Sequence, residues 1–468
     1  MGRTLIDKLW DSHVVADLGG GAALLYIDRI FLHERTGSVS LQELKKAGRA
    51  VRHKEHVFVT MDHIVDTFPG RGDKTLMPTG TAFITATRAT AREAGLNLFD
   101  VTDPRQGIVH VVSAEQGITL PGLTQVCPDS HTCTLGALGA LAWGIGSSEG
   151  EHALATKTLA VTKPKSMRVT FNGALGYGVT SKDMILHLIG TYGAAGGSGY
   201  AIEFTGPAIA SLPQENRFTI CNMAVEFGAF TGVIPPDEVT FAYVQGRPYA
   251  PKGADFERAV TAWRALKDDP DAAYDREIAV DCAAIAPTVT WGTSPGHAVR
   301  VDGTVPDPAA ATDAATRTSM AKALDYMGLA PGQQLEGLPI DAVFIGSCTN
   351  ARLSDLRAAA AVVKGRKISP ALKKAVIVPG STQVKLAAER EGLHDIFKAA
   401  GFEWRESGCS MCFYAGGEAM GEGWRVVSST NRNFENRQGP RTRTHLASPA
   451  TVAASALAGA IADVRKLG

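Results

Sequence analysis

Hydrophobic and polar positions along this chain alternate between short apolar runs rich in β-branched residues and longer stretches with helical spacing. The short runs predict strands, because buried strands of about four to eight residues read as nearly continuous apolar segments. The expected strands are 57–60, 107–112, 166–171, 342–345 and 375–378. Helices are predicted at 353–363 and at 448–464, the second capped by Ser448 with Pro449 in its first turn. This alternation is typical of an α/β fold.

Chain length and chain breaks favour several domains. The 468 residues exceed the roughly 250–300 at which a single hydrophobic core stops growing. Lys163-Pro164-Lys165 interrupts one unit, and a zone rich in Pro and Asp at 292–313 resembles a linker. We therefore predict three α/β units, at 1–165, 166–290 and 291–468.

Composition argues against several classes of protein. The 47 basic residues balance the 47 acidic ones, so the basic footprint of a protein that binds nucleic acid or an anionic membrane is missing. The first ten residues carry charges where a signal peptide needs an apolar run, and no stretch approaches the roughly 20 apolar residues of a membrane span. We expect a soluble, cytoplasmic protein that binds neither nucleic acid nor a membrane.

Three of the seven cysteines stand in motifs that suggest a metal centre. Cys348 directly follows the strand 342–345, and Cys409 and Cys412 form a Cys-x-x-Cys pair. Seven cysteines are too few for a secreted disulfide framework, and clustered cysteines in a reducing compartment more often serve metals or catalysis. Three thiolates could hold a 4Fe-4S cluster and leave one iron open as a Lewis acid. Buried thiols, a redox pair and half a zinc site are the alternatives, although no second CxxC or HxxxH completes a zinc set.

Several histidines and carboxylates stand near the ends of the predicted elements. They are Asp62-His63, His110, Asp129-Ser130-His131, and Asn222 with Glu226. Histidine–carboxylate pairs suit general acid–base chemistry, because the carboxylate fixes the tautomer and stabilises the imidazolium. His110 is expected to end an apolar strand, and the spacing of Asn222 and Glu226 predicts one face of a helix. Taken singly, Asp129 could be a helix cap and Glu226 a solvated helical charge.

Arginines in the segment 431–437 are candidate anchors for an anionic substrate. The segment reads Asn-Arg-Asn-Phe-Glu-Asn-Arg and offers Arg432 and Arg437. A planar guanidinium binds a carboxylate through two hydrogen bonds, which suits a dicarboxylic or tricarboxylic substrate. The alternative is a pair of surface arginines on a polar loop, which would suit Arg441 and Arg443 better.

In their order and context these motifs resemble the aconitase superfamily, and within it the isopropylmalate isomerase branch. The segments 347–350 and 408–412 look like the two cluster motifs of that superfamily. The segments 403–406 and 25–29, the latter followed by His33-Glu34, resemble the isopropylmalate isomerase branch. The resemblance runs from about residue 5 to residue 464 and so covers nearly the whole chain.

The resemblance implies three α/β/α domains of the aconitase type packed around one 4Fe-4S cluster per subunit, with one iron not ligated by cysteine. It also implies a hydro-lyase that interconverts 2- and 3-isopropylmalate, a hydroxy-diacid pair of leucine biosynthesis. Implied site residues are Cys348, Cys409 and Cys412 on the metal; the catalytic pairs Asp62–His63, Asp129–His110 and Glu226–His131; Ser130, Arg432 and Arg437 on the substrate; and Asn222, Asn350 and Asn431 near the cluster.

One part of the superfamily's machinery is missing from the sequence. Fused members carry a swivel domain whose Gly-Ser-Ser-Arg motif supplies a serine base. The nearest string here, at 146–149, has Glu149 in place of the arginine and lies in the first predicted unit. We expect the swivel domain, with its serine, on a separate small subunit, in a heterodimer or a higher assembly. The large subunit alone would then be nearly inactive.

Three departures from the branch bear on the substrate. Gly37-Ser38-Val39 replaces Ser-Pro-Gln, Ile64 replaces an Asn, and 413–418 replaces a short apolar stretch followed by Met-Asn. They leave open the same chemistry on another C2-substituted malate with a methyl, benzyl or phosphorus-bearing arm, because losing one polar contact changes discrimination strongly. A cluster-free relative that binds nucleic acid is the alternative from another class, disfavoured by the zero net charge and the intact catalytic positions.

Overall fold

The computed structural model of the chain describes residues 2–467, without the side chain of residue 415. It divides into two compact units. The first comprises Met1–Val65, Gly72–Gly173 and Gly197–Val280, and the second comprises Asp66–Arg71, Ala174–Gly196 and Asp281–Gly468. The finer division into three domains stays a prediction.

A five-stranded parallel sheet is the centre of the first unit. Its order is β5-β4-β3-β6-β7, with β3 (Arg29–His33), β4 (Val57–Thr60), β5 (Asn97–Phe99), β6 (Thr124–Cys127) and β7 (Leu141–Gly144). Counted along the chain, this is the order 3-2-1-4-5. The strand order reverses at β3, and in such sheets ligands bind at the carboxyl ends of the strands beside this reversal.

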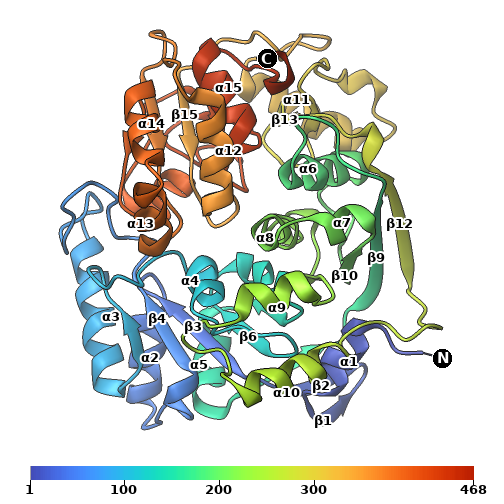
Figure 1. Cartoon of the computed structure of the whole chain (residues 1–468), viewed down its shortest axis with the longest axis vertical. Coiled ribbons are helices and arrows are strands. Elements are labelled where there is room, and N and C mark those ends of the chain that lie inside the picture. Colours follow the sequence, from blue (N-terminus) through green and yellow to red (C-terminus); the bar gives the residue numbers. More distant parts are fainter. Residues whose placement is uncertain (1, 468) are drawn as a thin grey trace. The chain divides into compact units, whose positions relative to one another are not determined.

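Further elements complete the first unit (Figure 1). The smaller sheets are β1 (Val14–Gly19) with β2 (Ala22–Tyr26) and β8 (Thr158–Thr162), and β11 (Thr231–Val233) with β10 (Tyr200–Thr205), β9 (Lys165–Asn172) and β12 (Arg276–Asp281). The helices are α1 (Leu5–Asp11), α2 (Gly37–Lys46), α3 (Gly80–Ala94), α4 (Val109–Glu115), α5 (Ser147–Thr156), α7 (Pro207–Ser211), α8 (Gln214–Asn222), α9 (Glu238–Val244) and α10 (Ala254–Trp263).

The second unit repeats the same strand order in a second five-stranded parallel sheet. Its order is β17-β16-β15-β18-β19, with β15 (Ala342–Ile345), β16 (Lys374–Ile377), β17 (Glu403–Trp404), β18 (Arg425–Ser428) and β19 (Arg443–Leu446). The strand order reverses at β15, which lies between β16 and β18. Two sheets with one topology therefore each offer a reversal point at which functional side chains can gather.

Helices and one hairpin complete this second unit. They are α6 (Ser181–Tyr192), α11 (Ala314–Met327), α12 (Leu353–Val363), α13 (Thr382–Arg390), α14 (Leu393–Ala400) and α15 (Pro449–Ala458), and the hairpin of β13 (Thr288–Thr290) and β14 (Ala298–Arg300). Figure 1 shows α12 beside β15, and α12 packs against α15. The α/β class is confirmed, and none of the described helices has the length and apolar character needed to cross a membrane.

Three expectations from the sequence are wrong in detail. The run 107–112 is no strand, because helix α4 begins at Val109 and carries His110 in its first turn. The last helix begins after its Ser448 cap as predicted but ends at Ala458, since Gly459 takes a left-handed φ of 68°. Asn222 ends α8, whereas Glu226 lies in the separate turn Val225–Phe227, so the two share no helix.

Candidate active-site residues

His63 lies between two carboxylates in the first unit, just beyond the end of β4. Its Nδ1 is 2.6 Å from Oδ1 of Asp62, and its Nε2 is 3.0 Å from Oδ2 of Asp129. Burial opposes a charge here, but the negative Asp62 and the hydrogen bond to Asp129 outweigh it and raise the pKa of His63 well above its ordinary value. An imidazole flanked in this way is held as the imidazolium.

Asp129 connects this pair to two further histidines. Nε2 of His110 lies 3.1 Å from its Oδ1, and the backbone N–H of His131 donates to the same oxygen at 2.8 Å. Burial favours a protonated carboxyl, yet the charge of His110 and the surrounding hydrogen bonds hold the pKa of Asp129 well below its usual range. Asp129 is therefore both the expected partner of His110 and the centre of a wider charge network.

The third expected pair closes the network. Nε2 of His131 is 2.8 Å from Oε1 of Glu226, and both side chains are largely buried, so Glu226 is not a solvated helical charge. Asn222 is buried nearby and donates from Nδ2 to Oγ1 of Thr134 at 2.8 Å. Ser130 is exposed, with its Oγ 3.5 Å from Nδ1 of His131. In each residue pair that the resemblance implied, a ring nitrogen lies within 3.1 Å of a carboxylate oxygen, and the catalytic roles of these pairs stay predictions.

Two residues that sequence reasoning did not place in the site organise it. Glu34 follows the central strand β3, is fully buried, and accepts the backbone N–H groups of Asp62 at 3.0 Å, His63 at 2.7 Å and Ile64 at 2.5 Å. Burial, together with the charge of Asp62, raises the pKa of Glu34. Glu34 thus fixes the turn that presents His63.

His33 is the second such residue. Its ring stacks on that of His63 with centroids 4.1 Å apart. Burial and the neighbouring His63 charge lower the pKa of His33 to about 4, which keeps it neutral. Ligand atoms of His33, Glu34, Asp62 and His63 lie within 4.8 Å of one another, but backbone donors and the His63 imidazolium already occupy the carboxylates. Their position in the sequence could have indicated both residues, because they stand at the carboxyl end of β3, where the strand order reverses and ligands commonly bind.

The second unit presents the three motif cysteines, all nearly buried. Cys348 follows β15, and Cys409 and Cys412 follow β17; their side chains are 7%, 8% and 6% exposed. Ser347 and Ser410, each beside a motif cysteine, take left-handed φ angles of 84° and 48°. Such conformations cost energy outside glycine and persist where the surroundings enforce them, commonly at functional sites.

Asn431, just beyond β18, brings two of the sulfurs to one place. Its Nδ2 is 3.5 Å from Sγ of Cys348, and its Oδ1 is 3.8 Å from Sγ of Cys412. Oγ of Ser347 lies 3.1 Å from the same Cys412 sulfur. Three cysteine thiols are a soft donor set, which iron–sulfur clusters and zinc both accept.

Cationic side chains lie near these sulfurs. Nη2 of Arg437 is 3.8 Å from Sγ of Cys412, and its guanidinium stacks 4.5 Å from the Phe413 ring. Lys182 is fully buried, and its Nζ donates to the carbonyls of Ser429 at 3.0 Å and Thr430 at 2.6 Å. Burial lowers the pKa of Lys182 to about 7. No sequence signal pointed to Lys182.

The remaining predicted residues of the second unit have local partners. Asn350, two residues after Cys348, donates from Nδ2 to Oδ1 of Asp355 at 3.0 Å, within the first turn of α12. Arg432 is half-buried, and its carbonyl accepts from Oγ1 of Thr430 at 3.4 Å. Arg441 is exposed and pairs with Glu422 at 2.7 Å, in accord with an ordinary surface arginine.

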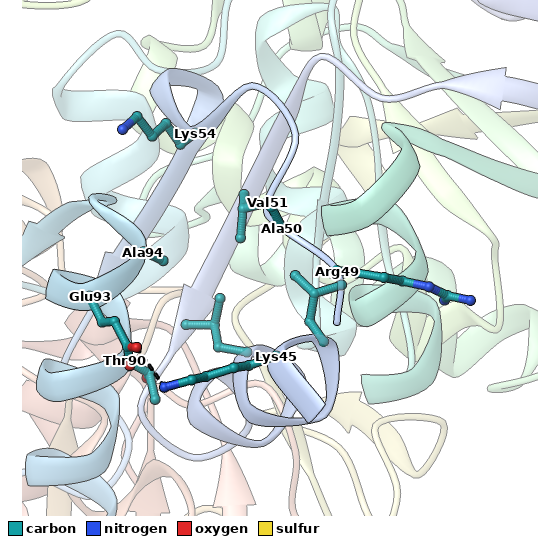
Figure 2. Close-up of a pocket in the computed structure, with 10 residues that line it drawn as sticks. Lys45, Arg49, Ala50, Val51, Lys54, Thr90, Glu93 and Ala94 are labelled. Atoms are coloured by element: carbon teal, nitrogen blue, oxygen red, sulfur yellow. Dashed lines mark hydrogen bonds and ion pairs between the residues drawn. The ribbon is translucent and has the colours of Figure 1, made fainter. Parts of the chain in front are cut away.

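A concave region of the first unit lies apart from the predicted chemistry. A pocket of about 530 Å³ between α2 and α3 is lined by Leu41, Leu44, Lys45, Arg49, Ala50, Val51, Lys54, Thr90, Glu93 and Ala94. Figure 2 shows Lys45 and Glu93 meeting across it, with nitrogen and oxygen 2.5 Å apart. None of the lining residues is a histidine, a cysteine or a member of the Asp129 network, so this pocket is not the candidate active site.

Comparison with known proteins identifies the family. The chain is 55% identical over 466 residues to a curated protein named "3-isopropylmalate dehydratase large subunit 1" from Bradyrhizobium diazoefficiens, and the alignment covers 100% of this chain and 97% of that protein. A sequence profile described as Aconitase family (aconitate hydratase) matches residues 7–459. The resemblance inferred from the motifs is thereby confirmed, and this chain belongs to the aconitase family.

Proposed function

We propose that this chain is the large subunit of a 3-isopropylmalate dehydratase, which interconverts 2- and 3-isopropylmalate in leucine biosynthesis. Membership of the aconitase family makes it a hydro-lyase. The observation that carries the proposal is the full-length likeness to a relative of that name, in a chain that retains both the His–carboxylate network and three buried motif cysteines.

The network provides the proton chemistry of a dehydration. Loss of water needs a donor to the leaving hydroxyl and a base for the carbon-bound proton. His63, held protonated by Asp62 and Asp129, supplies a proton at neutral pH. His131 and Glu226 form a second pair that can carry a proton. The hydrogen bond from the His131 backbone N–H to Asp129 orients this pair.

The cysteines and their neighbours fit a 4Fe-4S cluster. Cys348, Cys409 and Cys412 would hold it, and an iron without a cysteine ligand would supply a Lewis acid for a hydroxyl and a carboxylate. Asn431 orients two of the thiols, and Arg437, stacked on Phe413, supplies a fixed positive charge for a substrate carboxylate. Arg432 is the second proposed carboxylate anchor.

A second polypeptide completes the proposed enzyme. The named relative is a "large subunit", which implies a small-subunit partner. We propose that this partner carries the swivel domain and the serine base, and that the assembly is a heterodimer or larger. The zero net charge gives no support to a nucleic-acid partner.

The proposal is tested by co-expressing the chain with its small subunit and purifying both without oxygen. Turnover of 2-isopropylmalate is followed by the absorbance of the unsaturated intermediate, and iron and sulfide are determined on the same sample. Cys348→Ser should abolish turnover and deplete iron. Cys282→Ser is the matched control, because Cys282 is a buried cysteine of the second unit outside the motifs and should tolerate the change.

Three results would contradict parts of the proposal. A full cluster without turnover of isopropylmalate would shift the substrate to another C2-substituted malate. Undiminished turnover without the small subunit would remove the separate serine base. Absence of iron after anaerobic reconstitution would reject the cluster.

A further inference from the structure

Glu418 is a buried carboxylate in the second unit that collects hydrogen bonds from three separate parts of the chain. Its side chain is 3% exposed. Its Oε2 accepts from Nη1 of Arg405 at 2.7 Å and from Oγ of Ser410 at 2.7 Å. Its Oε1 accepts from Oγ1 of Thr67 at 2.9 Å and also from the Thr67 backbone N–H. The carboxylate is thereby saturated with donors, as a buried charge requires.

One of these donors belongs to the turn that bears two motif cysteines. Ser410 lies between Cys409 and Cys412 and takes a left-handed φ of 48°, which is unfavourable for serine. A strained residue keeps its conformation only where the surrounding structure fixes it. The hydrogen bond to Glu418 anchors the Ser410 side chain and so helps to hold this turn in shape.

Another donor belongs to the segment Asp66–Arg71, far away in sequence. Besides the Thr67 contacts, the carbonyl of Thr67 accepts the backbone N–H of Glu406 at 2.8 Å, and Arg71 donates to the carbonyl of Ser407. The segment therefore lies along residues 406–410, immediately before and within the cysteine turn. Glu418 contacts both the segment and the turn and ties one to the other.

We propose that Glu418 is a positioning residue that holds the Cys409–Cys412 turn, through Ser410 and Thr67, in the geometry that retains the metal cluster. The inference depends on the cluster of the proposed function. It also gives the departure at 413–418 a structural role, because Glu418 accepts hydrogen bonds from Arg405, Ser410 and Thr67. Outer hydrogen bonds of this kind commonly change metal retention by roughly 10- to 100-fold.

Glu403, the other carboxylate bound by Arg405, provides a matched control. The guanidinium of Arg405 pairs with Glu418 on one side and with Glu403 on the other, where Nη2 lies 2.6 Å from Oε2. Glu403 is 49% exposed, and its carboxylate accepts from Arg405 and not from the described residues of the cysteine turn. Glu403→Gln therefore removes a carboxylate from the same arginine while leaving Ser410 and Thr67 anchored.

The experiment compares the cluster-loaded wild-type chain with Glu418→Gln, Ser410→Ala and Glu403→Gln. Iron release to a ferrous chelator is followed by absorbance without oxygen, and the thermal unfolding of each metal-free chain is measured in parallel. Glu418→Gln should release iron about tenfold faster or more, Ser410→Ala should also accelerate release, and Glu403→Gln should stay within about twofold of wild type. Glu418→Asp, which retains the charge, should recover part of the retention.

The outcomes separate this inference from the proposed function. Equal release from wild type, Glu418→Gln and Ser410→Ala would overturn the positioning role while leaving the cluster in place. Faster release from Glu403→Gln to the same extent would also overturn it, because the effect would then come from Arg405 alone. If Glu418→Gln fails to fold, Ser410→Ala decides. A wild-type chain that binds neither iron nor sulfide would reject the cluster itself.

Discussion

Replacing Glu203 by glutamine should make the protein more stable at alkaline pH. Glu203 lies on β10 with its side chain 1% exposed. The hydroxyl of Tyr274 is 2.6 Å from its Oε2 and 2.8 Å from Oδ2 of Asp268. A hydroxyl has a single proton to donate, so it cannot satisfy both carboxylates. Both contacts of the Tyr274 hydroxyl are satisfied when one of the two carboxyl groups keeps its own proton and donates it to the hydroxyl oxygen.

The pKa of Glu203 gives the magnitude. Burial, reinforced by the negative charge of Asp268, raises it from 4.5 to about 8. A raised pKa in the folded state means that the associated stability is fully present below the ordinary pKa and is lost as pH rises through about 8. The shift corresponds to about 5 kcal/mol in total, of which about 3 kcal/mol is lost between about pH 5.5 and about pH 8. A glutamine cannot ionise and avoids this loss.

The assay is urea unfolding of wild type and Glu203→Gln across this pH range, with hydrogen exchange in the peptide that contains β10 to locate the effect. The stability advantage of the variant should grow by about 3 kcal/mol toward pH 8. Glu277→Gln on β12 is the control, because Glu277 is 54% exposed and pairs with Arg168 at the surface. Such pairs contribute roughly 0–1 kcal/mol. An advantage of Glu203→Gln that stays constant with pH would refute the reasoning.

Three further predictions follow from the first unit. Glu226→Gln should lower turnover of the two-subunit enzyme by about 10²- to 10⁴-fold with an unchanged iron content, because His131 loses its carboxylate partner. Steady-state kinetics and iron analysis test this, and turnover close to that of wild type would contradict it. Asp237→Asn should lower the free energy of unfolding, measured with urea, by about 3 kcal/mol, because the buried Arg217 loses a carboxylate that accepts two hydrogen bonds of 2.7 Å. A decrease below about 1 kcal/mol would contradict this. Glu34→Ala should lower kcat more than it changes KM, because the turn bearing His63 loses its acceptor, and a change confined to KM would count against that role.

The sequence was sufficient where a local pattern determines the structure. Strand β4 is a buried apolar run between polar ends, and α12 begins and ends where its helical spacing does. The apolar run 107–112 predicts a strand, whereas the structure forms helix α4 there. Residues Val109–Ala114 are all buried, and an element covered on every side has no polar face to reveal its period. Gly459 ended the last helix against an alanine-rich pattern that would otherwise continue.

The site was predictable in its members but less so in its connections. Motifs identified the cysteines and the histidines, yet nothing local shows that Asp129 serves His63 as well as His110. Glu34 acts on a turn 28–30 residues away, and Glu418 acts on Thr67 across 351 residues. Such contacts depend on how the fold brings distant segments together, which spacing along the sequence does not encode.

The shared strand order of the two five-stranded sheets has a consequence for substitutions in the candidate site. The histidine–carboxylate network lies at the reversal of strand order in one sheet, beyond β3, β4 and β6, while the motif cysteines and Asn431 follow strands of the other, β15, β17 and β18. Each set of candidate site residues thus lies in loops at the strand ends of its own sheet, where sequence varies more freely than in the strands. Under the proposed function, substitutions in the loops of one sheet would alter metal binding or proton transfer while leaving the strands of the other sheet unchanged.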